Sequence, residues 1–135
     1  MRGVFLCYKE AAKIMIKQGR GGKIIDACST LGYKAASMQA SYSATKWGVR
    51  GLTQVAAIEW IPYNITVNAY CPGFIKTPLS DCAVENLAKL EGKASEEIVN
   101  DSIKRIPLDR IGHPDDVANM VSFLASKDSD YITGQ

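Results

Sequence analysis

Tyr42 and Lys46 are the side chains whose types and spacing most directly suggest chemistry. They stand four residues apart in a stretch predicted to be helical, so both side chains should lie on one helix face. A phenol exchanges a proton with a substrate oxygen near neutral pH only if its pKa falls from about 10. A nearby ammonium group favours the phenolate and lowers that pKa. The pair therefore predicts a proton-transfer site.

A structural interpretation of the same pair stands beside the catalytic one. Tyr42 can be a tyrosine at the edge of the core, and Lys46 a solvated charge. The chain has six tyrosines and many lysines, so one such spacing arises readily by chance. The pair needs support from residues elsewhere in the chain.

That support comes from residues that follow the two predicted strands. Ser29 follows the first strand, and the Pro72-Gly73 pair and Thr77 follow the second. Ligands of open parallel sheets bind outside the carboxyl ends of the strands, and the helix that carries Tyr42 starts from the same edge. We expect these segments to converge on one rim, where the serine hydroxyl would hydrogen-bond a substrate oxygen and align it with the phenol.

The elements that must position these residues alternate between helix and strand. A strand, a helix and a second strand form a βαβ unit, which predicts a parallel sheet with a right-handed crossover and an α/β fold. The second predicted helix carries few charges and several small residues, so we expect it to be covered on more than one side. Helices are predicted over residues 3–18, 42–60 and 114–126, a polar helical region over residues 80–105, and strands over residues 23–28 and 65–71.

Length and charge limit the classes of partner. The chain of 135 residues is one domain or part of one, and its net charge of +2 is small and scattered. Neither nucleic acid nor a membrane surface is indicated as a partner. No apolar run is long enough to cross a bilayer, and no signal peptide is indicated. A cytoplasmic location is the expectation.

The cysteines and the histidine do not form a metal-binding pattern. Four cysteines occur without a C-x-x-C pair, which is typical of a reduced chain, and we interpret them as small buried hydrophobic residues. The single His113 precedes Pro114 at the predicted start of a helix, where a capping or loop role is favoured. Asp115 and Asp116 are expected to compensate the helix dipole rather than to bind a metal ion.

Taken together, the motifs resemble the short-chain dehydrogenase/reductase family. Ser29 precedes Tyr42 by 13 residues, within the spacing that this family shows. The resemblance covers essentially the whole chain. It rests on the segments Gly22-Lys23-Ile24-Ile25, Cys28-Ser29-Thr30-Leu31-Gly32, Tyr42-Ser43-Ala44-Thr45-Lys46, Asn64-Ile65-Thr66-Val67-Asn68 and Pro72-Gly73-Phe74-Ile75-Lys76-Thr77-Pro78.

The resemblance implies a Rossmann-type doubly wound parallel sheet and a role for each motif residue. Ser29 would orient the substrate carbonyl, Tyr42 would be the acid/base, and Lys46 would bind the nicotinamide ribose and lower the tyrosine pKa. The implied cofactor is NAD, with NADP as the alternative, and it would carry the hydride. The implied nicotinamide contacts, beside Tyr42 and Lys46, are Pro72, Gly73, Ile75 and Thr77.

The flanking residues are most similar to diacetyl/acetoin reductases, also called butanediol dehydrogenases. This similarity implies a vicinal diketone or hydroxyketone as the small-molecule substrate, and a homotetramer for the full-length protein. The alternatives are a reductase of 3-oxoacyl thioesters or of sugar alcohols, a non-catalytic partner on the same fold, and an inactive fragment. The segment at residues 80–105 is either a substrate lid or plain packing.

Two parts of the family pattern have no counterpart in the chain. Gly19 to Gly22 follow a helix and precede a strand, whereas a dinucleotide-binding glycine loop needs the reverse order. Residues 1–135 are therefore interpreted as the catalytic half of a Rossmann-type dehydrogenase, lacking the N-terminal cofactor-binding half and the last strand. By itself this half is expected to be inactive, with poor solubility a second expected consequence, because one side of its sheet would be uncovered.

Overall fold

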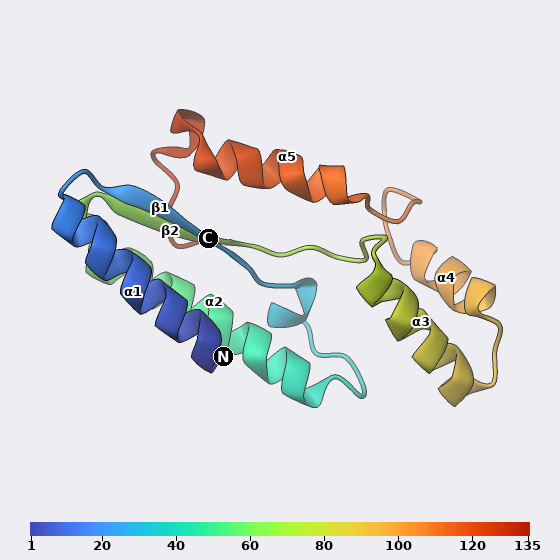
Figure 1. The fold of residues 1–135 in the computed structure, drawn as a ribbon. Coiled ribbons are helices and arrows are strands. Elements are labelled where there is room, and N and C mark those ends of the chain that lie inside the picture. The colour runs from blue at the N-terminus through green and yellow to red at the C-terminus, as the bar shows by residue number, and fades with distance from the viewer. The chain divides into compact units, whose positions relative to one another are not determined.

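The structure is a computed structural model that describes residues 1–135. It divides into two compact units, residues 1–72 with 119–135, and residues 73–118. The first unit contains both strands, which pair in parallel from Gly22 opposite Ile65 to Ala27 opposite Tyr70 (Figure 1). The helices are α1 (Arg2–Gln18), α2 (Ala40–Trp60), α3 (Pro78–Glu91), α4 (Ser95–Ile103) and α5 (Pro114–Ala125), and the strands are β1 (Gly22–Ala27) and β2 (Ile65–Tyr70).

Helix α1 ends at a glycine in the left-handed conformation, which residues with a side chain rarely adopt. Gly19 caps the helix with φ of 68°, in the left-handed region, and its N–H bonds to carbonyls of the last turn. Gly21 also has a positive φ, and a Cβ there would lie 2.4 Å from the Asn64 carbonyl oxygen. The glycine cluster therefore turns the chain from α1 into β1, as the sequence order predicted.

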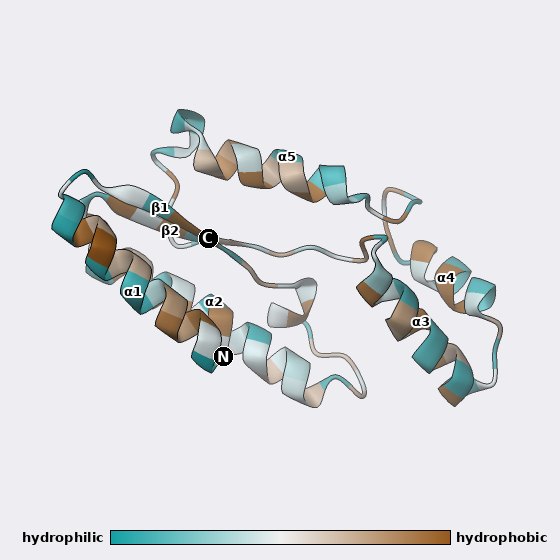
Figure 2. Cartoon of the chain, in the orientation of Figure 1, coloured by the Kyte–Doolittle hydropathy of each residue, from teal (hydrophilic) through white to brown (hydrophobic).

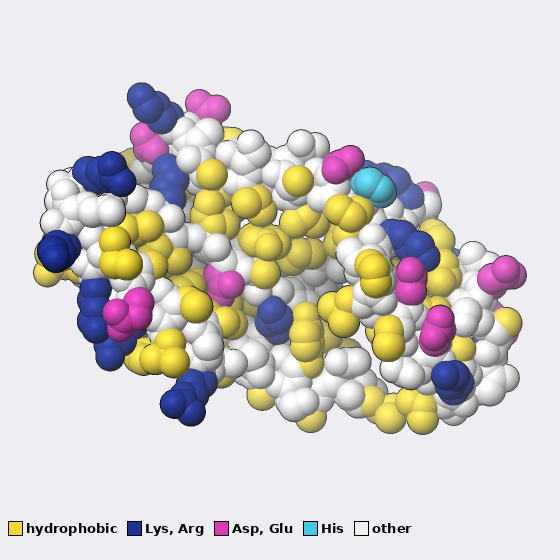
Figure 3. All heavy atoms as spheres, viewed as in Figure 1, with side chains coloured by type: hydrophobic (Ala, Val, Ile, Leu, Met, Phe, Trp, Pro, Cys, Tyr) yellow, Lys and Arg dark blue, Asp and Glu magenta, His cyan; other side chains and the backbone are white.

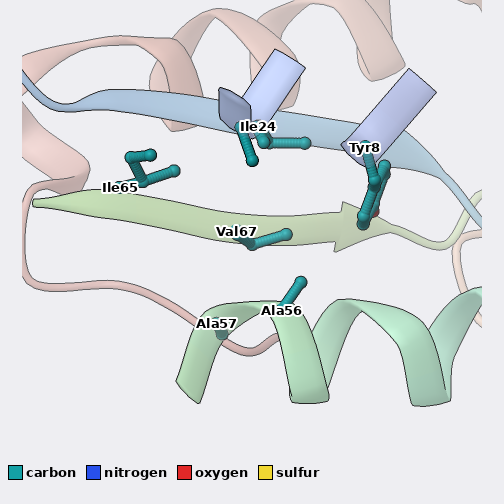
Figure 4. Packing of buried hydrophobic residues seen from close by; sticks show 7 residues of the cluster. Tyr8, Ile24, Ala56, Ala57, Ile65 and Val67 are labelled. Atoms are coloured by element: carbon teal, nitrogen blue, oxygen red, sulfur yellow. The ribbon is translucent and has the colours of Figure 1, made fainter. Parts of the chain in front are cut away.

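The core of the first unit lies between the sheet and one pair of helices. Helices α1 and α2 lie side by side on one face of β1 and β2 (Figure 1). Ile24 points from β1 and Val67 from β2 towards Ala56 of α2 (Figure 4). Ile65 and Val67 are completely inaccessible to solvent, as expected where a β-branched strand is covered by helices. Because the two strands are parallel, their carboxyl ends lie at the same edge of the sheet.

Strand β2 is also bonded along its other edge. The N–H of Gly134 donates to the Val67 carbonyl over 2.7 Å, and the N–H of Ala69 donates to the Gln135 carbonyl. The buried Asn68 side chain bonds the same segment at both of its ends, to Ile132 and to Gln135. Strand β1, in contrast, pairs only with β2.

Tyr8 of α1 gives the core a measurable response to pH. Burial raises the pKa of Tyr8 to about 12, although its hydroxyl bonds Thr53 of α2 over 3.0 Å. Because the folded chain keeps the phenol neutral above the unfolded pKa of about 10, the stabilisation is complete below pH 10 and is lost as pH rises towards 12. We expect the unfolding free energy to fall over that window, and less steeply in Tyr8→Phe.

Denaturant titrations of the two proteins at several alkaline pH values measure this difference. Exposed Tyr63, replaced in the same way, is the matched control and should leave the slope unchanged. Parallel slopes for the parent chain and Tyr8→Phe would contradict the assignment.

The helical region predicted over residues 80–105 contains two helices, α3 and α4, because Gly92 takes a left-handed backbone and ends the first one. Two other sequence-based expectations are wrong in detail. Helix α2 is covered on one face only, since Val55 and Ile58 are 52% and 75% exposed. Not all cysteines are buried: Cys28 is, Cys71 is half-buried, and Cys7 and Cys82 are exposed; all four are free thiols.

The second unit packs around α3 and α4. Val84 and Ala88 of α3 meet Ile98 of α4 in a small apolar cluster, whereas Leu90 stays 66% exposed.

The helix predicted over residues 114–126 is confirmed as α5. Asp116 forms a bidentate ion pair with Arg110 at 2.7 and 2.9 Å and accepts the His113 N–H, so it anchors the start of α5. The arginine lowers the pKa of the Asp116 carboxyl well below its usual range.

Candidate active site

Ser29 lies where β1 ends and the chain turns. Its backbone is extended, and its hydroxyl oxygen accepts the Leu31 N–H over 3.2 Å, which starts the short 3-10 turn Thr30–Gly32. The side chain is 9% exposed. Only the acceptor side of the hydroxyl is used in this bond, so the Ser29 O–H can still be donated to a ligand.

The ends of the two strands are joined at this point. The N–H of Cys28 donates to the Tyr70 carbonyl over 2.8 Å, and the N–H of Thr30 donates to the Pro72 carbonyl over 3.1 Å. Ser29 and Pro72 therefore lie on neighbouring chain segments beyond the sheet edge. This part of the predicted convergence is confirmed.

Lys46 reaches the same edge from helix α2. Its ammonium donates to the Ala27 carbonyl oxygen over 2.7 Å, two residues before Ser29 in the chain. The same ammonium lies 5.5 Å from the centre of the Tyr42 ring, so the two side chains share a helix face as predicted. A positive charge is thereby held beside the phenol and at the end of β1.

Tyr42 occupies the first turn of α2 and is open to solvent. Its side chain is 40% exposed, and its hydroxyl makes no hydrogen bond within the chain. A phenol in this state can donate its O–H to an incoming ligand without first breaking an internal hydrogen bond. Lys46 is the fixed member of the pair and Tyr42 the accessible one.

The remaining motif residues belong to the second unit. Thr77 caps α3: its hydroxyl oxygen accepts the Ser80 N–H, and its own N–H donates to the Ser80 hydroxyl. Ile75 pairs in parallel with Gly112 through bonds made by Phe74 and Lys76. The N–H and C=O of Ile75 consequently point away from Gly112 and are free to bond another group.

Sequence reasoning missed two residues next to this edge. The Cys28 thiol donates to the Lys46 carbonyl oxygen over 3.3 Å, which ties the end of β1 to the helix. Asp26 accepts the Ala27 N–H through one carboxylate oxygen over 2.8 Å, and its other oxygen is buried without a partner. A carboxylate inside the apolar strand Gly22–Ala27 was the available signal for Asp26. The sequence offered none for the thiol contact.

The other candidate residues lie apart from this chemistry. His113 and Asp115 are exposed side chains 3.4 Å apart at the start of α5, which fits the expected loop role. No helix in the chain is both long enough and apolar enough to cross a membrane. Figure 3 shows basic and acidic side chains interspersed over the visible face, with no continuous patch of either sign.

The parallel strands, the crossover helix and the residues at the strand ends define the class of the chain as a Rossmann-type α/β fold. A family model described as enoyl-(acyl carrier protein) reductase matches residues 1–135. The chain belongs to the short-chain dehydrogenase/reductase family.

Two relatives and two solved structures illustrate this membership. The chain is 49% identical over its whole length to a short-chain dehydrogenase/reductase of Armillaria gallica, of which it covers 50%. It is 48% identical over 98% of its length to the (S)-acetoin-forming diacetyl reductase of Staphylococcus epidermidis, of which it covers 52%. The chain thus spans about half the length of the curated relatives that it matches.

The solved structures agree in fold over the same portion. A sorbitol-6-phosphate 2-dehydrogenase from Erwinia amylovora superposes with a TM-score of 0.93 and 36% identity, covering 98% of the chain and 52% of that protein. An NAD+-bound xylitol dehydrogenase gives a TM-score of 0.87 at 30% identity, covering 93% of the chain and 50% of that protein. The incomplete Rossmann-type sheet expected from the sequence is confirmed.

Proposed function

We propose that this chain supplies the proton-transfer residues of an NAD(P)-dependent oxidoreductase that interconverts a carbonyl and a secondary alcohol. The observation that carries the proposal is the Lys46 ammonium, bonded to the end of β1 and 5.5 Å from the Tyr42 ring. In the reductive direction Tyr42 would give its proton to the substrate oxygen, and Ser29 would donate a hydrogen bond to that oxygen. Lys46 would stabilise the phenolate that remains.

The residues present fit a nicotinamide group. Its carboxamide carries both donors and an acceptor, which the free N–H and C=O of Ile75 complement, with the Thr77 hydroxyl proton as a further donor. Pro72 and Gly73 complete the proposed contacts to the ring, and Tyr42 and Lys46 those to its ribose. When bound, the nicotinamide supplies or accepts the hydride. NAD is the proposed cofactor and NADP the alternative, since one similar structure, a xylitol dehydrogenase, binds NAD+ and another, from Agrobacterium tumefaciens, binds NADP.

For the substrate we propose diacetyl, acetoin or 2,3-butanediol. The support is the 48% identity to an acetoin-forming diacetyl reductase. The competing classes are sugar alcohols, on the likeness to sorbitol-6-phosphate and xylitol dehydrogenases, and acyl thioesters, on the matching family model. In each ketone or alcohol of these classes the carbonyl carbon would accept the hydride or the carbinol carbon would donate it. Contacts to the rest of the substrate must therefore distinguish the classes.

The test is an NADH-oxidation assay on the longest in-frame translation product of the gene that contains residues 1–135. We expect turnover of diacetyl and acetoin at rates at least tenfold above those of a hexitol phosphate and a 3-oxoacyl thioester, since substrate preferences of this size follow from a few contacts. Chain 1–135 alone is expected to give background rates. Preference for another substrate would replace the substrate class, and absence of turnover on every carbonyl tested would contradict the proposed reaction.

A homotetramer is the proposed assembly of the longest in-frame translation product. Support comes from helices α1 and α2, both of which contain hydrophobic residues (Figure 2), and Phe5 of α1 and Val55 and Ile58 of α2 are exposed. A groove of about 460 Å³ runs between these helices, and Phe5, Val55 and Trp60 contribute to its lining.

Light scattering after gel filtration measures the assembly. Val55→Asp should dissociate it, because a buried unpaired carboxylate is costly, whereas Ser41→Asp on the exposed first turn of α2 should leave it intact.

A further inference from the structure

Two cysteines occupy equivalent positions at the ends of the paired strands. The last pair in the register is Ala27 opposite Tyr70, and the next residue of each strand is Cys28 or Cys71. The pairing continues to this point, because the Cys28 N–H donates to the Tyr70 carbonyl over 2.8 Å. Neighbouring strands lie about 4.8 Å apart, which is within the range of Cα separations that disulfides span.

The two side chains lie beside each other on the same face of the strands, because residues that pair in a parallel register project in the same direction. Burial raises the pKa of the Cys28 thiol, and the neighbouring Cys71 thiol raises it further. Cys7 and Cys82, by contrast, are isolated and exposed.

The surroundings give the two thiols different roles. Cys28 is buried, and burial raises the pKa of its thiol. Cys71 is only half-buried, so a small oxidant reaches it more readily. The accessible thiol is therefore the one oxidised first, and the buried thiol is the one positioned to resolve the product.

The Cys28 sulfur is also part of the framework of the candidate site. Its thiol donates to the Lys46 carbonyl, and a Cβ on Gly32 would lie 2.6 Å from the sulfur, so the turn Thr30–Gly32 packs directly on it. That turn begins at Ser29. A change in the bonding of this sulfur therefore acts on both Ser29 and the backbone of Lys46.

We propose that Cys28 and Cys71 are a reversible modification site, which a hydroperoxide closes into a disulfide. The Cys71 thiolate attacks the peroxide oxygen, giving a sulfenic acid and releasing water once the proton is returned. The Cys28 sulfur then attacks the Cys71 sulfur, and its proton leaves with the hydroxyl as a second water. Two thiols and one hydrogen peroxide thus become one disulfide and two waters. The Cys28 sulfur loses the hydrogen that it donates to Lys46.

The effect on catalysis rests on the proposed function, whereas the disulfide itself does not. Because small displacements of catalytic groups cost large factors in rate, we expect the oxidised enzyme to lose about tenfold or more of its activity. A dithiol reductant should restore the activity. Cys28→Ser should make the activity insensitive to mild peroxide, since a serine cannot form the bond.

Mapping of the cross-link tests the site without using activity. Chain 1–135 with Cys7→Ser and Cys82→Ser retains only the two strand-end cysteines, and both replaced residues are exposed. After peroxide treatment and tryptic digestion, we expect one disulfide-linked peptide pair containing Cys28 and Cys71. Its formation should be faster in the folded chain than in denaturant. The parent chain, digested in parallel, should give the same pair in excess over links to Cys7 or Cys82.

Sulfinic or sulfonic acid on Cys71 with no linked peptides from the folded chain would overturn the proposal. A cross-link that forms while the longest translation product keeps its full activity would confirm the modification and reject its effect on catalysis. A product without any dehydrogenase activity leaves the mapping result intact, so the two failures are distinguishable.

Discussion

Replacing Tyr42 by phenylalanine in the longest translation product is expected to lower kcat for carbonyl reduction about 1,000-fold, within the range of general acid catalysis. The reason is that phenylalanine keeps the ring near the Lys46 ammonium but removes the only proton that the site delivers to the substrate oxygen. Since Tyr42 is 40% exposed and its hydroxyl has no partner in the chain, the fold should not change. Steady-state kinetics should show a KM within a few-fold of the parent value.

Tyr33→Phe is the matched control. Tyr33 is also exposed, and its ring packs 4.1 Å from the Arg50 guanidinium, a contact that phenylalanine preserves. We expect parent-like rates for this variant. Equal losses in the two variants would indicate a general effect of tyrosine removal. A Tyr42→Phe enzyme with parent-like kcat would remove Tyr42 from the mechanism.

The sequence predicted the parallel core of the fold well because local signals and tertiary packing agree there. Gly19 and Gly21 form the turn before β1, and β-branched residues of β2 are buried under the helices. The predictions were less accurate where contacts between distant segments determine the structure. A helical region could be predicted over residues 80–105, but not the point at which Gly92 divides it into α3 and α4. A single glycine inside a helical pattern does not show whether the helix continues or ends there.

In the candidate site, too, some contacts could be predicted from the sequence and others could not. That Ser29, Lys46 and Pro72 lie at one sheet edge could be predicted, because strand order and handedness dictate it. The contact of the Cys28 thiol with the Lys46 carbonyl could not, since a cysteine after a strand reads equally well as a small apolar residue. Which way Cys71 faces depends on the register, which is fixed by pairing between distant segments.

The outer surfaces of α1 and α2 show why the small number of charges on α2 gave a wrong expectation about its burial. Few charges on α2 suggested burial on several sides, yet the chain covers only the side that meets the sheet. Ile58 and Val55 remain exposed together with Phe5 of α1. An apolar helix face indicates that the face is suited to burial. It can be buried by another part of the same chain or by a second copy of it.

Replacing Ile65 by alanine is expected to have the largest effect on stability, about 2–5 kcal/mol in the unfolding free energy. Ile65 is completely inaccessible and lies at the start of β2, between the sheet and the α1–α2 layer. Removal of its side chain deletes apolar contacts and leaves a cavity that the flanking strand and helices cannot close without moving. Urea unfolding of chain 1–135, followed by circular dichroism, measures the change.

Ile58→Ala on α2 makes the same chemical change at a position that is 75% exposed, so it should alter the free energy by less than about 0.5 kcal/mol. A ratio near one between the two losses would mean that β2 is not the packed centre of the unit. The position of Ser29 and Lys46 at the end of β1, which pairs with β2, would then lose its structural basis. A large loss for Ile65→Ala alone would confirm that β2 is the packed centre of the unit that carries Ser29 and Lys46.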